Sequence, residues 1–263
     1  MMRPDRPTTS ARQGTAGRFS VMSRFGVPDG IRACLFDLDG VLTRTAAVHR
    51  AAWREVFDPL LASHGQPPFT DKDYLRFVDG KPRRDGVRDF LAARGIARAE
   101  GSPDDSPEAD TVAGIGNRKN LLLLKRLEED GVEVFPGSVT YLRVVHGAGV
   151  RTAVVTSSAN GAEVIRAAGI EHLVEERVDG VVADREGLPG KPEPDTFLAA
   201  ARRLGVEPGE AAVFEDAQAG IAAGRAGGFG FVVGVDRGDQ ADALRESGAD
   251  VVVNDLSDLL DAS

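Results

Sequence analysis

The chain has 263 residues, of which 42% are hydrophobic and 28% charged, with one cysteine and a formal net charge of −9. This composition excludes a wholly disordered, collagen-like or coiled-coil chain. The negative net charge argues against sequence-independent binding to nucleic acid. The lone Cys34 excludes a disulfide framework or a CxxC zinc site. No apolar run approaches the roughly 18 residues that a transmembrane helix needs. We therefore expect a soluble, cytoplasmic globular protein that binds neither nucleic acid nor membranes.

The first thirty residues differ in composition from the rest of the chain. They hold five arginines but only two acidic residues, and they lack the apolar stretch of a secretory signal. A transit peptide, or a start upstream of a true beginning at Met22, would also fit this pattern. We interpret residues 1–30 as a disordered tail outside the fold.

From residue 31 onward, short apolar runs alternate with helix-length segments. The runs occupy residues 33–36, 152–155, 211–214, 231–233 and 251–253. Such runs are typical of strands in a parallel sheet that is buried on both faces. The predicted fold class is therefore α/β, with a Rossmann-like parallel-sheet core whose ligand crevice lies beyond the carboxyl ends of the strands.

A long segment without strand-like runs separates the first two predicted strands. Its pattern predicts helices over 46–63, 71–77, 83–94 and 111–129, with a loop near 101–107 that is rich in Gly, Ser and Pro. An insertion at the end of the first strand would lie over the ligand crevice. We therefore predict a core of residues 31–45 and 135–263 and an inserted, all-helical cap of residues 46–134.

Two carboxylates follow the first predicted strand in the sequence Asp37-Leu38-Asp39-Gly40. In an extended chain Asp37 and Asp39 point the same way, and two like charges so close need a cation between them or a proton on one of them. Asp216 follows the third run and could complete the oxygen ligands that Mg²⁺ prefers. The alternative interpretation is an ordinary turn at the end of a strand.

Two other segments offer groups that bind phosphate. Lys191 lies in a loop stiffened by prolines, and a lysine near Asp37 would offset carboxylate repulsion and hold a transferring phosphoryl group. Thr156-Ser157-Ser158-Ala159-Asn160 follows the second run and offers hydroxyls, an amide and helix N–H groups. Taken singly, Lys191 could be a solvated loop residue and the second segment a plain helix cap.

Taken together, these segments resemble the four motifs of the haloacid dehalogenase superfamily. The resemblance rests on Phe36–Val41, Thr156, Lys191 and Glu215-Asp216, in that order and at those strand ends. It implies that Asp37 is the nucleophile, which forms an aspartyl-phosphate, and that Asp39 is the general acid/base. Asp39 also argues against a dehalogenase, because those members lack the second aspartate.

The same resemblance assigns the phosphate and metal ligands. It implies that Thr156 and Lys191 bind phosphoryl oxygens. It also implies that Mg²⁺, the one expected cofactor, is held by Asp37, the Asp39 carbonyl and Asp216, with Glu215 in support. This agrees with the needs of phosphoryl transfer, which are in-line positioning and neutralisation of spread negative charge.

Motifs in the cap narrow the resemblance to the β-phosphoglucomutase family, over nearly all of residues 31–255. They are the helical stripe Thr45, His49 and Trp53, the segments Gly80-Lys81-Pro82-Arg83 and Asn117-Arg118-Lys119-Asn120, and the core segment from Phe214 to Ile221. By position, Thr45 and His49 match hinge and acid/base-gating residues, Arg83 and Lys119 match cap phosphate ligands, and Asn160 matches a distal phosphate ligand. We expect Ser157, Ser158 and Trp53 to contact substrate as well.

Each cap residue also has a structural interpretation. His49 could be a partly buried helix residue, Trp53 a core residue and Arg83 a surface charge. The chain departs from the family at Ala159, which replaces a phosphate-binding lysine, and at Asp79, where some members have another cap lysine. It also has an extra loop around residues 98–110.

The resemblance implies a mutase that converts β-D-glucose 1-phosphate to glucose 6-phosphate through an aspartyl-phosphate and glucose 1,6-bisphosphate. The first alternative is a sugar-phosphate phosphatase of the same superfamily, and the second is a sugar-phosphate-binding regulator that has lost catalysis. We expect small phosphorylated sugars as partners and a monomeric protein.

Overall fold

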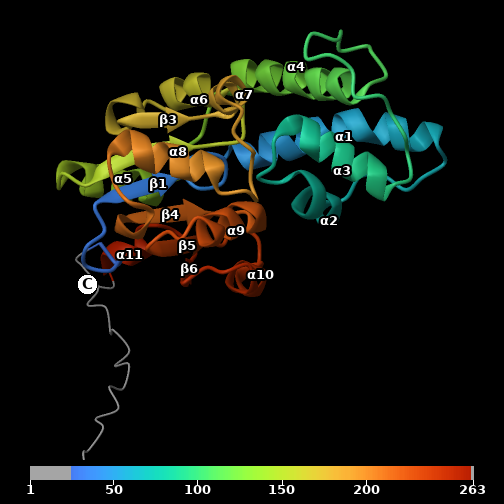
Figure 1. The fold of residues 1–263 in the computed structure, drawn as a ribbon. Helices are drawn as coiled ribbons and strands as arrows, with labels where there is room; N and C mark the ends of the chain where they lie inside the picture. The colour runs from blue at the N-terminus through green and yellow to red at the C-terminus, as the bar shows by residue number, and fades with distance from the viewer. Residues whose placement is uncertain (1–24, 262–263) are drawn as a thin grey trace, which may run out of the picture.

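The computed structural model describes residues 25–261, in which six parallel strands form one sheet (Figure 1). The strand order is β3-β2-β1-β4-β5-β6. The strands are β1 (Ala33–Phe36), β2 (Arg151–Val155), β3 (Glu176–Val178), β4 (Ala211–Glu215), β5 (Phe231–Val235) and β6 (Val251–Val253). The sequence predicts five of them, but it misses β3, a three-residue edge strand with two charged residues.

The register of the central strands brings their carboxyl ends to the same level. Phe36 pairs with Val154 on one side and with Phe214 on the other. The residues that follow these three strands therefore meet at one edge of the sheet, as we expect for a parallel α/β sheet.

The sheet is buried on both faces, because alternate residues of each strand face opposite sides. Cys34 and Phe36 pack into one hydrophobic cluster, with α5 (Pro136–Gly147), α6 (Gly161–Ala167) and α11 (Asp258–Asp261). Ala33 and Leu35 pack into another. The helices of that second face are α7 (Gly180–Glu186), α8 (Asp195–Leu204), α9 (Gln218–Ala226) and α10 (Ala241–Glu246). Single 3₁₀ turns lie at Glu171–Leu173 and Pro208–Glu210.

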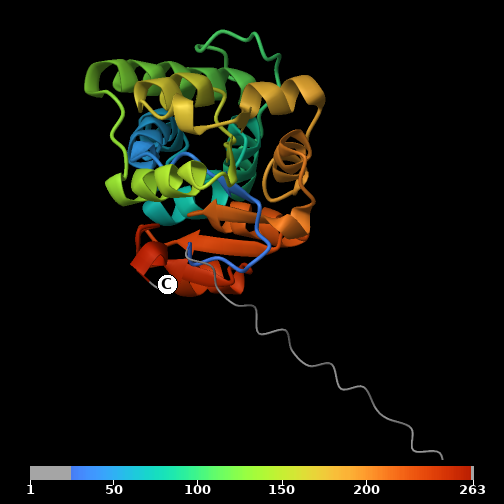
Figure 2. The same cartoon turned by 90° about the vertical axis from the view of Figure 1, so that its left-hand side faces the viewer.

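The inserted segment is helical and has its own core. It holds α1 (Thr45–Ser63), α2 (Asp71–Asp73), a π-helical turn (Tyr74–Val78), α3 (Arg83–Ala93) and α4 (Val112–Asp130). These helices enclose a separate cluster that includes stacked Trp53 and Phe57. Figure 1 shows them beside one end of the sheet, and Figure 2, viewed from the far side of the core, shows them behind it. We keep the name cap for residues 46–134.

The helices of the cap agree with the predicted ones to within a residue or so at their ends, except at 71–77. There the sequence predicts one short α-helix, whereas the structure has the three-residue α2 followed by the π-helical turn. The π-turn matters for the site, because Tyr74 and Val78 both line the pocket described below.

Residues 25–30 differ from the predicted disordered tail. Val27 is buried in the core, and the Tyr141 hydroxyl donates a hydrogen bond of 2.9 Å to the carbonyl of Phe25. The remainder of the predicted tail, residues 1–24, lies outside the described residues. Within residues 25–261, no helix has the length and apolar character needed to cross a membrane.

Candidate active site

A buried ion cluster lies where β1, β2 and β4 end. Lys191 donates hydrogen bonds to Asp37 Oδ1 at 2.5 Å and to Glu215 Oε1 at 2.6 Å. A third bond of 3.1 Å reaches the carbonyl of Val155. Lys191 is thus not the solvated loop lysine of the alternative interpretation, since its side chain is 1% exposed.

The electrostatics of this cluster show that it lacks positive charge. Burial alone would lower the pKa of Lys191, but Asp37 and Glu215 raise it above its ordinary value. Burial raises the pKa of Asp37 well above its ordinary range, although Lys191 opposes the shift, and burial together with neighbouring carboxylates does the same for Asp216. One ammonium therefore faces three buried carboxylates, and a further cation would stabilise them as anions.

The oxygen atoms around Asp37 fit a magnesium site in which the protein supplies only a few of the ligands. Among residues 25–261, no three Asp, Glu, His or Cys side chains form a ready-made metal site. Glu215 is already bound at both carboxylate oxygens, Oε1 by Lys191 and Oε2 by the backbone N–H of Ala217 at 2.8 Å, whereas Lys191 binds only Oδ1 of Asp37. Asp37 and Asp216 remain, and the chain at Gly40 (φ +95°) passes so close to Asp216 that a Cβ there would overlap its carboxylate. Carboxylates plus a main-chain oxygen suit Mg²⁺, which keeps several waters.

Asp39 is held by two threonines from different parts of the chain. Thr45, in the first turn of α1, donates a short hydrogen bond to Oδ1, and Thr156, after β2, donates one of 3.2 Å to Oδ2. A hydroxyl group can donate or accept. The two threonines can therefore hold Asp39 in place whether or not its carboxyl carries a proton.

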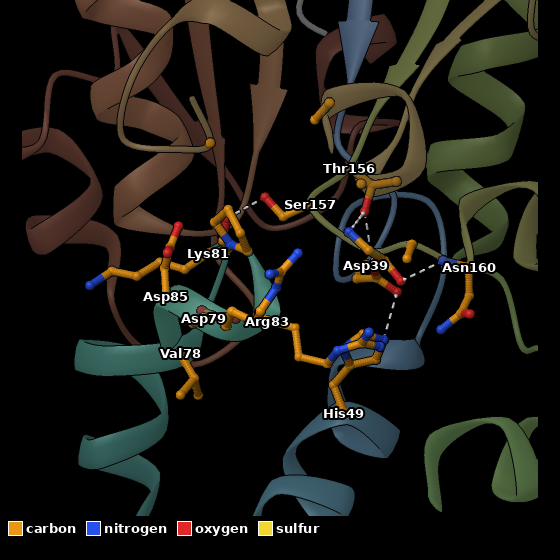
Figure 3. A pocket seen from close by; sticks show the side chains of 18 of the residues that line it. Asp39, His49, Val78, Asp79, Lys81, Arg83, Asp85, Thr156, Ser157 and Asn160 are labelled. Carbon is orange, nitrogen blue, oxygen red and sulfur yellow. Dashed lines mark hydrogen bonds and ion pairs between the residues drawn. The ribbon is translucent and has the colours of Figure 1, made fainter. Parts of the chain in front are cut away.

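His49 lies one turn further along α1 and is also directed at Asp39 (Figure 3). Its Nε2 is 3.6 Å from Asp39 Oδ1, and its Nδ1 is 3.0 Å from the amine of Lys119 on α4. Burial and Lys119 lower the pKa of His49 to about 4, so the imidazole is neutral at pH 7. A hydrogen bond donated by Lys119 to Nδ1 leaves the proton on Nε2, the nitrogen that faces Asp39.

The cap contributes two further cations to the same space. Lys119 is buried, and burial lowers its pKa to about 7. Arg83, at the start of α3, reaches into the pocket that holds Asp39 (Figure 3), and its buried Nε has no hydrogen-bond partner among residues 25–261. The pocket has a volume of about 420 Å³ and is lined by both core and cap residues.

The segment after β2 connects core and cap. Ser157 donates a hydrogen bond of 2.8 Å to the carbonyl of Gly80, and the Asn160 amide donates one of 2.9 Å to Asn120 Oδ1 on α4. Ser158 accepts from the backbone N–H of Asn160 at 3.2 Å. Ser157, Ser158 and Asn160 all line the pocket, where they could reach a bound phosphate. Their contacts with phosphate stay predictions.

The structure brings the predicted site residues to this pocket or to the ion cluster behind it, except Thr45, which joins the site through its hydrogen bond to Asp39. Trp53 lines the pocket and also packs on Phe57, so the predicted contact with substrate and the structural interpretation of this residue are compatible. Tyr74 and Asp79 also line the pocket, although the sequence singles out Asp79 only as a departure from the family and gives no role to Tyr74. Burial raises the pKa of Asp79 to about 7, although a hydrogen bond from Tyr74 opposes the shift. Only the position of Asp79 next to Gly80 hints at this pair.

Comparison with known proteins identifies the family. A model of haloacid dehalogenase-like hydrolases matches residues 31–228. A β-phosphoglucomutase of Mycobacterium tuberculosis is 53% identical over 245 residues, which cover 89% of this chain and 94% of the relative. The chain belongs to the β-phosphoglucomutase family of the haloacid dehalogenase superfamily.

Other members of the superfamily are similar over most of the chain. Hexitol phosphatase A of Escherichia coli is 32% identical over 86% of this chain and 91% of the relative. The crystal structure of a β-phosphoglucomutase from Clostridium difficile is 26% identical, covers 87% of this chain and 93% of that one, and superposes with a TM-score of 0.69. Both the fold class and the family resemblance expected from the sequence are thus confirmed.

Proposed function

We propose that this protein is a β-phosphoglucomutase that converts β-D-glucose 1-phosphate to glucose 6-phosphate through glucose 1,6-bisphosphate. The observation that carries the proposal is the buried, unpartnered Nε of Arg83 in the pocket next to Asp39. A buried donor without an acceptor is costly, so Arg83 fits a ligand that brings a second anionic group. A mutase needs such a site, because its intermediate carries two phosphates.

In the first step, a carboxylate oxygen of Asp37 attacks one phosphorus of glucose 1,6-bisphosphate, the bond from that phosphorus to the sugar oxygen breaks, and a glucose monophosphate leaves. Asp39 gives its proton to the departing oxygen, and the product is phospho-Asp37. In the reverse direction Asp39 takes the proton from a sugar hydroxyl, whose oxygen attacks phospho-Asp37. A carboxylate nucleophile thus divides one difficult displacement into two easier ones.

The bisphosphate formed in this way then presents its other phosphate to Asp37. Lys191 is positioned to neutralise the transferring group near Asp37, while Arg83 and Lys119 would hold the phosphate that is not reacting. The cap residues would also exclude water, which would otherwise discharge phospho-Asp37. This division of tasks is what the geometry supports.

We also propose Mg²⁺ as the cofactor, held by Asp37, Asp216 and the carbonyl of Asp39, with Glu215 in support. When bound, it would neutralise charge on the phosphoryl oxygens. The shortage of positive charge around Asp37 and Asp216 supports this assignment. The expected monomer and the cytoplasmic location stay predictions.

A sugar-phosphate phosphatase is the alternative, and it is favoured by the similarity to hexitol phosphatase A and by the loss of positive charge at Ala159 and Asp79. It would use the same Asp37 and Asp39 but pass the phosphoryl group to water. A regulator that has lost catalysis fits less well, because the side chains that the chemistry needs, Asp37, Asp39, Lys191 and Asp216, are all present in the site.

A ³¹P NMR time course tests the proposal. The sample would contain the protein, Mg²⁺, β-glucose 1-phosphate and a trace of glucose 1,6-bisphosphate. We expect glucose 6-phosphate to form without inorganic phosphate. Release of inorganic phosphate as the sole product would contradict the mutase and favour the phosphatase.

A further inference from the structure

Asn117, in the second turn of α4, connects Arg83 to the extra loop of the cap. Its Nδ2 donates two hydrogen bonds, to the carbonyls of Pro103 at 2.9 Å and Asp105 at 2.8 Å. An amide NH₂ group has two hydrogens, and carbonyls can only accept. Both hydrogens are therefore committed, and the orientation of the amide is fixed with Oδ1 turned the other way.

That oxygen faces the guanidinium of Arg83. Arg83 Nη2 donates to Asn117 Oδ1 at 3.5 Å, a long hydrogen bond. The stem of Arg83 runs past Gly116, where an added Cβ would lie 3.4 Å from Arg83 Cγ. Gly116 and Asn117 thus define the path of the side chain and the direction of its head, while Nε stays free for a ligand.

The loop that orients Asn117 is itself anchored. Thr111 donates a hydrogen bond of 2.6 Å to Asp105, and Arg118 donates one of 2.6 Å to the carbonyl of Pro107. Gly101 has φ +73°, and a Cβ there would overlap Asp105 and Thr111. Pro103 also lines the active-site pocket, so the loop forms part of its wall.

We propose that Asn117 is a positioning residue for Arg83, and that the loop of residues 101–110 sets where the second phosphate of the substrate binds. This inference rests on the proposed function, in which Arg83 holds the phosphate that is not reacting. The binding of substrates with two phosphates should depend on the position of Arg83, whereas the binding of substrates with a single phosphate should not.

The test uses the full-length Asn117→Ala protein and the KM for glucose 1,6-bisphosphate in the mutase assay. The substitution removes the hydrogen bond between Asn117 Oδ1 and the charged Arg83. Because this bond is long, we expect KM to rise by only about three- to tenfold. The KM for hydrolysis of acetyl phosphate, which carries no second phosphate, should stay unchanged. Equal changes for both substrates would overturn the proposal.

Two further variants separate positioning from general loosening of the loop. Arg118→Ala removes only the anchor at Pro107 and keeps the Thr111–Asp105 bond and the two carbonyls that hold the Asn117 amide, so it should leave KM for the bisphosphate within about twofold. In an Arg83→Ala background, Asn117→Ala should have no further effect, because a residue that acts through Arg83 cannot act without it. A full, additive effect in that background would refute the proposal.

Folding and the proposed function are controlled separately. Should the alanine protein misfold, Asn117→Ser removes the amide with a smaller loss of polarity and carries the same expectation. Should the wild-type protein release only inorganic phosphate, the mutase assignment fails. Wild type, the Asn117→Ala and Arg83→Ala proteins and the double variant would then be compared by KM for hydrolysis of glucose 1,6-bisphosphate, and the same loss of effect in the Arg83→Ala background would support the positioning role.

Discussion

The ion cluster of the core and the cations of the cap differ in how their charges are satisfied. In the core, Lys191 is bound to Asp37, Glu215 and a main-chain carbonyl, all within hydrogen-bond distance. In the cap, the buried Nε of Arg83 has no hydrogen-bond partner in the described part of the chain, and Lys119 is buried beside a neutral histidine. The charged groups of the core are therefore bound to one another without substrate, whereas in the cap the Nε donor of Arg83 is left for a ligand to bind.

This difference separates two tasks. The core groups act on whichever phosphate reaches Asp37, and their bonds to one another keep them in place for phosphoryl transfer. Under the proposed function, the cap groups would select a substrate by its second anion and would decide whether sugar or water receives the phosphoryl group. Substitutions in the core should therefore lower every activity, and substitutions in the cap should change the balance between activities.

Replacing the nucleophile should have the largest effect. Asp37→Asn removes the oxygen that attacks phosphorus, so mutase activity and hydrolysis of acetyl phosphate should both fall by at least about 10³-fold. The measurement is single-turnover formation of the aspartyl-phosphate, with circular dichroism to confirm folding. Retained hydrolysis would contradict the role of Asp37.

Replacing the acid/base should have a smaller and more selective effect. Asp39→Asn should slow transfer to and from sugar oxygens by about 10²- to 10⁴-fold, because these oxygens need a proton donor. Acetyl phosphate has a better leaving group, so it should still phosphorylate Asp37 at a rate closer to wild type. Equal slowing with both donors would argue against proton transfer by Asp39.

The burial of Lys119 predicts a pH dependence of stability. Its pKa in the folded state is about 7, against 10.5 ordinarily. Between these values the unfolded chain binds a proton that the folded chain does not, so stability rises with pH, by at most about 1.4 kcal/mol per pH unit. Urea unfolding should show the stability of wild type rising relative to that of Lys119→Met between pH 7 and 9, and no relative rise would contradict the lowered pKa of Lys119.

The exposed ion pair between Arg84 and Asp184, two residues that line the pocket, should matter least. Arg84 on α3 lies 3.6 Å from Asp184 on α7, and both side chains are substantially exposed. Arg84→Ala should change kcat/KM by less than about threefold, and the change should shrink at high salt. A larger, salt-independent loss would mean that Arg84 binds substrate directly.

The sequence predicts the core site better than the cap site, for a physical reason. The register of short parallel strands brings Asp37, Thr156 and Glu215 to one edge, and both the apolar runs and their order are local features of the sequence. The contacts of Asn117 and Asp79 depend instead on how a loop and a π-helical turn fold against neighbouring helices. No local pattern specifies those contacts, and only the structure shows them.

The most direct test of the division between core and cap is the ratio of mutase activity to acetyl phosphate hydrolysis in the Arg83→Ala protein. Without the arginine the second phosphate loses its charged partner, so we expect mutase kcat/KM to fall about 10- to 100-fold. Hydrolysis of acetyl phosphate should stay within about twofold of wild type, because the core cluster is untouched. Equal loss of both activities would contradict the account, since Arg83 would then serve the core chemistry or the fold itself.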